Sequence, residues 1–440
     1  MNDRSRRLRP LAIGGALLAA LGCASSTPQP AAEPAVAAAP ATTAAVGAAE
    51  IDRLLLAGDI EGAERLALPF GLDAASATDP ALALAVGRVR LLRNELDAAE
   101  RWLQRALALD ATGTAAPRLL AEAYRRRDRF AEAIPLLRAA GQTAEADMLA
   151  SFAGQSPYEL AADSPAETSV DFVQTDPLPL MRLRVNGKDG TFLLDTGGSD
   201  LLLDPEFAAA AGARNFGSRE GTFGGGKKAA TGIGRVDSLT LGEVTIRNLP
   251  VRTLPTRRFG AVCGGCTVDG VLGTVVLYHF LSTIDYPAGK LSLRRRGAAA
   301  DAAGSAHRIR FWMAGDHYLL ALGGLGDTPA LPLLVDTGLA GMAFTAPPAL
   351  FAAAGIAPAG PSGTGTGGGG AMTVTPVEVP LLTLGDARRE HLTGVIGPFP
   401  PQLETSQGVR IAGLISHEFF RRWALTVDFD RMELRLAEPR

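Results

Sequence analysis

The sequence reads Phe192-Leu193-Leu194-Asp195-Thr196-Gly197 in one place and Leu333-Leu334-Val335-Asp336-Thr337-Gly338 in another. Both stretches are an apolar run that ends in Asp-Thr-Gly, a pattern that suits a strand followed by a tight turn. One copy of so short a motif is a weak signal, because it also occurs by chance. Two copies in the same context predict two lobes that each contribute one aspartate to a shared site.

The landmarks after each Asp-Thr-Gly repeat as well. In both halves a hydrophobic turn is followed by two short strands, with the matched pairs Gly270 and Gly413, Asp285 and Asp428, and Leu291 and Leu434. The position numbers within each pair differ by 143 (413 − 270), and those of the two aspartates by 141 (336 − 195). A glycine-rich stretch lies between motif and turn in both halves, at residues 221–226 and 363–370. So constant an offset predicts a duplicated domain whose loops differ slightly in length.

Local patterns favour an all-β fold for both copies. Residues 181–185 alternate between apolar and charged side chains, Asn186-Gly187 is a tight-turn pair, and residues 191–194 form the next apolar run. In the second copy, residues 317–322 and 331–335 take these places around a glycine-rich loop. The expected order is strand, hairpin, strand and then aspartate.

These ordered landmarks resemble the aspartic peptidases, specifically a bilobed bacterial relative of the pepsin and retropepsin families. The resemblance covers roughly residues 170–440. It implies an all-β fold of two pseudo-twofold-related lobes, with a flap that closes over an extended polypeptide substrate. The activity implied is that of an aspartic endopeptidase, which needs neither a metal nor a cofactor.

The chemistry of this family requires two carboxylates side by side. Two such groups cannot both ionise, so the pair shares one proton and titrates as a unit. The ionised member takes a proton from a water while the protonated member polarises the scissile carbonyl, without a covalent intermediate. The resemblance assigns these roles to Asp195 and Asp336.

The same resemblance assigns supporting roles around the two aspartates. Thr196 and Thr337 are expected to hydrogen-bond across the lobes, and Gly197 and Gly338 to let the backbone turn so that amides point at the aspartates. Ser199 is the expected hydroxyl partner of the first carboxylate. The expected flap residues are Thr222, Phe223, Gly224, Gly225, Gly367 and Gly368.

Two departures from the family pattern leave a second interpretation open. The second lobe has Leu339-Ala340 where a hydroxyl is expected, and Ser416 where the first lobe has Gly273. The glycine-rich stretches also lack a flap tyrosine. The alternative is an inactive peptide-binding or scaffolding lipoprotein that retains the fold. Simpler interpretations of the motifs are Asx-type turns at the aspartates and flexible linkers at the glycines.

The N-terminus has the features of a targeting signal. Four arginines precede an apolar run over residues 11–21, which is too short to span a bilayer. The run ends in Ala20-Leu21-Gly22-Cys23, which resembles a bacterial lipobox and makes Cys23 the lipidated residue. An ordinary secretory peptide cut near Ala24 is the alternative. A lipid anchor predicts the bacterial cell envelope, and the lack of a retention aspartate after Cys23 favours the outer membrane, facing the periplasm.

The other two of the 3 cysteines, Cys263 and Cys266, are close in sequence. In an oxidising compartment such a pair predicts a local disulfide. No strand-to-helix context supports a redox motif, and the 5 histidines show no zinc-ligand spacing.

Residues 50–150 have a helical pattern with a repeat. Leu96 and Phe130 stand in similar surroundings and differ in position number by 34 (130 − 96). The small residues Gly87 and Ala121 share that step, and residues 58–63 look like an earlier copy. The period resembles tetratricopeptide repeats. Two interpretations stay open: a helical spacer packed on the catalytic lobes, or a groove that binds a protein partner.

Composition limits the remaining possibilities. The 440 residues carry a net charge of −3, so charge gives no case for binding nucleic acid or acidic lipids, and any membrane attachment is expected through the lipid alone.

The predicted organisation is a signal peptide at 1–22, an Ala/Pro-rich tether at 23–49, an all-α tetratricopeptide-like domain at 50–150, and peptidase lobes at 168–296 and 305–440.

Overall fold

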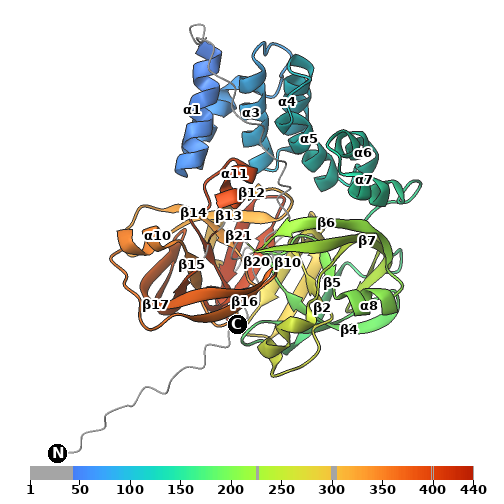
Figure 1. Ribbon diagram of the computed structural model, residues 1–440, viewed down its shortest axis with the longest axis vertical. Coiled ribbons are helices and arrows are strands. Elements are labelled where there is room, and N and C mark those ends of the chain that lie inside the picture. Colours follow the sequence, from blue (N-terminus) through green and yellow to red (C-terminus); the bar gives the residue numbers. More distant parts are fainter. Residues whose placement is uncertain (1–42, 224–226, 299–304, 398, 400, 440) are drawn as a thin grey trace, which may run out of the picture.

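The computed structural model describes residues 43–223, 227–298, 305–397, 399 and 401–439. It is a multidomain structure in which an N-terminal helical region lies on a larger β-rich part (Figure 1). The predicted signal peptide and Cys23 lie outside the described residues. Within the described residues, no helix combines the length and the apolar character needed to cross a bilayer.

The helical region consists of consecutive helices that pack on their sequence neighbours. They are α1 (Thr43–Ala57), α2 (Ile60–Ala67), η1 (Leu68–Phe70), α3 (Pro80–Leu92), α4 (Leu96–Leu109), α5 (Ala115–Arg126), α6 (Phe130–Ala139) and α7 (Thr143–Ala150). Helices α4 and α6 begin at Leu96 and Phe130, the two residues related by the repeat in the sequence. Gly87 marks a close approach of α3 and α4, because a Cβ there would lie 2.9 Å from the Leu103 side chain.

The predicted boundary of the tether was wrong at its C-terminal end. Helix α1 begins at Thr43, inside the segment expected to extend to residue 49. The alanines that made this segment look unstructured are also the best helix formers, and Ile51 and Leu55 bury fully on the following helices. Tertiary burial therefore extends the helix into the alanine-rich sequence.

The first β half contains β2 (Glu167–Gln174), β3 (Leu180–Val185), β4 (Lys188–Leu194), β5 (Leu201–Leu203), α8 (Pro205–Ala210), β6 (Arg214–Thr222), β7 (Lys228–Leu241), β8 (Val244–Thr253), η3 (Arg257–Cys263), β9 (Gly270–Leu272), α9 (Thr274–Leu277), β10 (Phe280–Asp285) and β11 (Lys290–Arg295), and β1 (Glu159–Leu160) pairs with β8. The second half contains β12 (Ser305–Ala314), β13 (Tyr318–Leu325), β14 (Leu331–Val335), β15 (Phe344–Ala346), α10 (Pro348–Ala353), β16 (Gly363–Gly367), β17 (Gly370–Leu384), β18 (Ala387–Ile396), α11 (Pro401–Gln407), β19 (Gly413–Ile415), α12 (His417–Phe420), β20 (Ala424–Asp428) and β21 (Glu433–Ala437). The two lists run in the same order, as expected of a duplication.

The halves join through strands that correspond to each other. β10 pairs antiparallel with β20, and Thr283 lies opposite Thr426, its own counterpart in the second half. Their hydroxyls are 2.8 Å apart. A pairing in which equivalent residues meet is the signature of a twofold contact, here within one chain.

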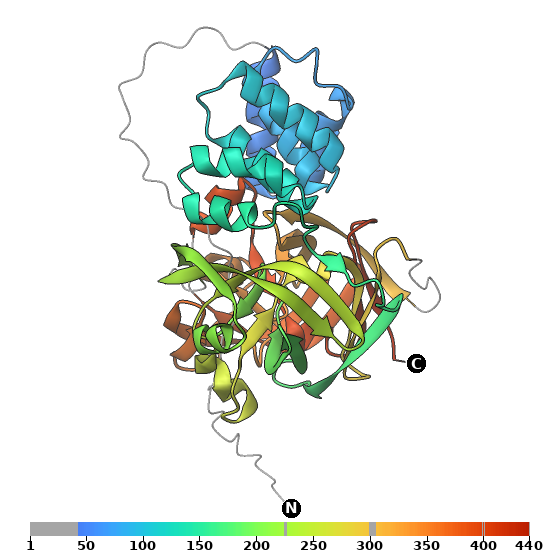
Figure 2. The same ribbon diagram turned by 90° about the vertical axis from the view of Figure 1, so that its right-hand side faces the viewer.

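The helical region packs on both halves, as in the spacer interpretation (Figures 1 and 2). Asn94 accepts a hydrogen bond from the Tyr278 hydroxyl of the first half (3.1 Å) and donates to the Phe429 carbonyl of the second (3.2 Å). The buried carboxylate of Glu64 accepts from Trp312 Nε1 at 2.8 Å. These polar contacts, of which that of Glu64 is buried, fix the region at the junction of the two halves.

Candidate active site

Each Asp-Thr-Gly turn lies at the end of a strand held by the same parallel pairing. β4 pairs with β9 in the first half, and β14 pairs with β19 in the second. The backbone N–H of Asp195 donates to the Leu272 carbonyl at 3.1 Å, and that of Asp336 to the Ile415 carbonyl at 2.9 Å. Both aspartates are fully buried. Strand pairing alone thus brings the two predicted residues to equivalent positions.

The threonines link the two turns reciprocally. The Thr196 N–H donates to Thr337 Oγ1 at 3.0 Å, and the Thr337 N–H donates to Thr196 Oγ1 at 3.1 Å. Thr196 Oγ1 also donates to the Val335 carbonyl at 2.8 Å. These buried hydrogen bonds hold the two halves in register at the site.

The glycine amides point at the aspartates as predicted, and the structure shows what a side chain would obstruct. Gly197 N–H donates to Asp195 Oδ1 at 2.8 Å, and Gly338 N–H to Asp336 Oδ1 at 2.9 Å, so the amides do point at the aspartates. Neither glycine, however, has a positive φ. What excludes a side chain is space: a Cβ on Gly197 would lie 2.4 Å from the Asp336 carboxyl carbon, and one on Gly338 would lie 2.3 Å from that of Asp195. Each glycine therefore leaves room for the aspartate of the opposite half.

The two carboxyls form one titrating unit. Burial, followed by repulsion from Asp336 and hydrogen bonding with it, raises the pKa of Asp195 well above its usual value. Burial also raises the pKa of Asp336, to about 6, although the Gly338 amide and Asp195 stabilise its ionised form. Apart from each other, the Oδ2 atoms have no hydrogen-bond partner among the described residues. The raised pKa values favour a pair that holds one shared proton.

Ser199 does not make the contact expected of it. Among the described residues its hydroxyl forms no hydrogen bond with Asp195, and its carbonyl accepts from the Val275 N–H at 2.8 Å. A hydroxyl is instead present in the second half, where Ser416 Oγ accepts from the Leu339 N–H at 3.0 Å. The departure of Ser416 from the family pattern was the available signal for this contact. The corresponding Gly273 leaves no such room, because a Cβ there would lie 2.4 Å from the Ser199 carbonyl oxygen.

Two hairpins occupy the expected flap positions. β6 and β7 pair as far as Thr222 and Lys228, and β16 and β17 as far as Gly367 and Gly370. Residues 363–370 are therefore a hairpin and not a linker. The tips meet, because a Cβ on Gly368 would lie 2.4 Å from the Phe223 ring. Gly224 and Gly225 lie outside the described residues.

The apolar environment of Phe223 explains the missing hydroxyl at Ala340. Asp195 and Asp336 together are called the dyad. Phe223 is buried in a cluster that contains Leu193 and Val271 from the strands beside the dyad, and Ala340 belongs to the same cluster. A hydroxyl at residue 340 would need a polar partner there.

The loop before β9 closes on the same cluster. Cys263 and Cys266 form a disulfide at the end of η3, with their Cα atoms 5.4 Å apart. Phe259 and Val262 of η3 pack in the cluster with Phe223.

One group of side chains in the described part of the chain could share a cation. Donor atoms of Asp176, His417 and Glu418 lie within 4.8 Å of one another. Arg421 already pairs with both carboxylates, at 3.1 Å from Asp176 and 3.0 Å from Glu418. Their charge is balanced by protein, and we assign no metal to them.

Comparison with known proteins is consistent with this geometry. Residues 181–276 match the family model described as aspartyl protease, a range that spans the first Asp-Thr-Gly and the Gly273 turn. A search of the curated proteins finds no match for the chain. The family match supports an aspartic-protease-like function, a peptidase type of hydrolysis and, with it, a polypeptide substrate.

Proposed function

We propose that the chain is a bilobed aspartic peptidase that hydrolyses peptide bonds by means of a water bound between Asp195 and Asp336. The observation that carries the proposal is the reciprocal fit of the two turns. Each aspartate lies against the glycine of the opposite turn, and each threonine amide donates to the opposite threonine hydroxyl. Two unrelated Asx turns would not need this reciprocity.

The two carboxyls divide the roles of base and acid. The ionised member of the pair takes a proton from the water, and the protonated member donates its proton to the carbonyl oxygen as the water oxygen bonds to the carbonyl carbon. Collapse of the resulting diol breaks the C–N bond, and the amine leaves with the proton taken from the water. The deprotonated member takes one hydroxyl proton from the diol and the carboxylic acid product keeps the other, so the cycle closes without a cofactor.

Access to the dyad requires the two hairpins to separate. Phe223 and Gly368 are in contact at the cluster beside the buried aspartates, and Arg258 donates to the Gly368 carbonyl. An extended peptide would displace this contact and lie beneath the hairpins. The hairpins would then exclude water from the reacting bond.

The cellular setting belongs to the same proposal. Cleavage before Cys23 and lipidation of its thiol and amine would leave a lipid-anchored protein in the bacterial envelope, at the outer membrane and facing the periplasm. The disulfide between Cys263 and Cys266 suits an oxidising compartment. The helical region would then be a tetratricopeptide-like module that travels with the peptidase.

The decisive test is the separate replacement of each aspartate by asparagine. Asp195→Asn and Asp336→Asn should each lower the rate of peptide hydrolysis by a factor of about 10²–10⁴ or more, because each removes one partner of the acid–base pair. Circular dichroism should show an unchanged fold. Asp189→Asn is the matched control, because Asp189 lies on β4 with its side chain 66% exposed.

Two results would overturn the proposal. One is an Asp336→Asn protein that hydrolyses peptides at the unmodified rate. The other is an unmodified protein that binds peptides but cleaves none between acid and neutral pH, which would establish the scaffolding alternative.

A further inference from the structure

A buried charge cluster joins the helical region to the first half close to Asp195. Glu145 of α7 forms two hydrogen bonds with Arg252 of β8, both at 2.6 Å. Arg252 Nε donates to Asp200 Oδ2 at 2.9 Å. All three side chains are at most 5% exposed. Asp200 is only five residues beyond Asp195, so the cluster lies where the chain leaves the first Asp-Thr-Gly turn.

The same cluster continues into the second half. Arg125 of α5 lies 3.8 Å from Glu145 and 3.1 Å from Asp316, in the turn between β12 and β13. Arg126 donates to the carbonyls of Met313 (2.9 Å) and Gly315 beside that turn. Asp316 also shares a hydrogen bond with His317 Nδ1 at 2.6 Å.

The cluster marks one end of the dyad. It brings together the segment after Asp195 and the β12–β13 turn, which belong to opposite halves. His317 is close enough to lower the pKa of Asp336 electrostatically, against the stronger effect of burial. The charges within the cluster are balanced, since Arg252 and Arg125 hold the pKa of Glu145 well below its usual value despite its burial.

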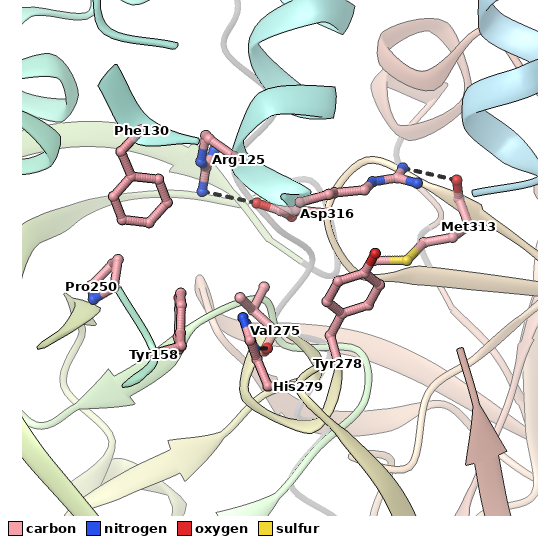
Figure 3. A pocket seen from close by; sticks show the side chains of 10 residues that line it. Arg125, Phe130, Tyr158, Pro250, Val275, Tyr278, His279, Met313 and Asp316 are labelled. Atoms are coloured by element: carbon pink, nitrogen blue, oxygen red, sulfur yellow. Dashed lines mark hydrogen bonds and ion pairs between the residues drawn. The ribbon is translucent and has the colours of Figure 1, made fainter. Parts of the chain in front are cut away.

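A small cavity lies at this contact between the helical region and the two halves. It has a volume of about 20 Å³ and lies between α5, the β12–β13 turn and α9 (Figure 3). Arg125, Tyr158, Val275 and Asp316 are among the residues that line it. That volume accommodates about one water, so the contact is closely packed.

The equivalent positions at the pseudo-symmetric end of the dyad are more exposed. The counterpart of Asp200 is Gly341, five residues beyond Asp336, and it is exposed. The turn between β2 and β3 corresponds to the β12–β13 turn. Its Asp176 pairs with Arg421, and their side chains are 50% and 42% exposed. The twofold arrangement of the halves is therefore broken at the two ends of the site.

We propose that the helical region closes one end of the substrate path, so that this peptidase acts on a polypeptide terminus and not on internal bonds. This inference rests on the proposed function. Asp200 is five residues from Asp195, so it lies within about 18 Å of it. An extended chain advances about 3.3 Å per residue. A substrate that passes the dyad toward Asp200 would therefore meet Arg252 and Glu145 within about five residues. Cleavage then releases a short fragment of fixed length from one end of the chain.

The experiment compares a linear unstructured peptide with the same sequence closed head to tail. The unmodified protein should cut the linear peptide at a constant distance from one terminus and leave the ring intact, as read by mass spectrometry. Attachment of a folded domain to one terminus should abolish cleavage from that terminus alone, which identifies the closed end. The Asp336→Asn protein, assayed in parallel, identifies cleavage that comes from this site.

The contrary results separate the two proposals. In the first, the unmodified protein cuts the ring, or internal bonds of the linear peptide, while the Asp336→Asn protein does not. That result would overturn the closed end, and the peptidase proposal would stand. Cleavage of neither peptide, or equal cleavage by Asp336→Asn, would refute the peptidase proposal and this inference with it.

Discussion

In the first half the turn after Asp195 packs against the bare backbone of Gly273, whereas in the second half the turn after Asp336 is held by the hydroxyl of Ser416. The contacts that touch the carboxylates themselves are nearly identical in both halves, with glycine amides at 2.8 Å from Asp195 and 2.9 Å from Asp336. The two halves therefore share the geometry around the aspartates and differ in the residues that support the turns. Under the proposed function, symmetry is required where the two carboxyls share a proton and is not required in the residues behind them.

A second difference separates the halves at their outer ends. Asp200 of the first half is buried beneath Glu145 and Arg252, but its counterpart Gly341 is exposed. The helical region lies over the junction of the two halves (Figures 1 and 2), and its Glu145 reaches Asp200 through Arg252. The helical region, which among the described residues has no counterpart on the second half at this position, therefore goes with the difference between Asp200 and Gly341.

The largest expected effect concerns the two glycines that lie against the aspartate of the opposite half. Gly197→Ala and Gly338→Ala should each reduce turnover about 10²-fold or more, because each methyl would displace the carboxylate of the opposite half by about 1 Å. The initial rate of peptide hydrolysis is the measurement. Gly363→Ala is the control, since it has open space and an ordinary φ. A large loss in only one of the two variants would break the proposed symmetry.

Gly273 and Ser416 hold the two turns in different ways, and exchanging one for the other should give unequal losses of stability. Gly273→Ser should cost about 3 kcal/mol, because its Cβ would overlap the Ser199 carbonyl oxygen. Ser416→Gly should cost only about 1–2 kcal/mol, the value of one buried hydrogen bond. Urea unfolding measures both free energies. Equal losses would mean that the two supports are interchangeable.

The pH dependence of stability should report the shared titration of the two aspartates. A carboxyl whose folded-state pKa is raised stabilises the fold fully below the unfolded pKa, and this stability is lost as the pH rises through the folded pKa. For this pair the loss begins near the ordinary pKa of 3.8, passes through about 6 and extends to higher pH.

Thermal unfolding at a series of pH values measures this. Asp336→Asn and Asp195→Asn should each reduce the decline above about pH 4, because each removes one carboxyl and its coupling to the other. An unchanged decline in either variant would show that the two carboxyls do not titrate as a pair.

The smallest expected effect belongs to the first half alone. Reduction of the disulfide between Cys263 and Cys266 opens a ring closed by residues only three apart in sequence, so it should cost no more than about 2 kcal/mol. The local change should reach Phe223, which shares a cluster with η3. Hydrogen exchange of residues 257–263 with and without reductant is the measurement, and global unfolding on reduction would contradict the expectation.

The sequence was sufficient to predict the strands that carry the aspartates. The offset between the two copies reappears in the pairing of Thr283 with Thr426, and the Asn186-Gly187 turn joins β3 to β4 as expected. Repetition and alternation are local properties, so they can be recognised without knowledge of the tertiary structure.

The contacts between distant segments could not be predicted. Glu145 and Arg252 are 107 residues apart, and neither lies in a motif. The period of the helices indicates which residues face inward, but not which partner they meet. The interlocking of Gly197 with Asp336 was missed for the same reason, although both residues had been assigned to the site.

The contact of Glu64 with β12 has a consequence for the order in which the protein is completed during synthesis. Arg93 supplies one partner to this buried carboxylate, but Arg310 and Trp312, the latter 248 residues further on, supply the others. As the nascent chain leaves the ribosome, the helical region emerges before β12 and holds a carboxylate whose later partners do not yet exist. Since an incompletely paired buried charge is costly, we expect the helices to reach their final packing only after β12 has emerged. A segment that is made early would thereby be late to mature.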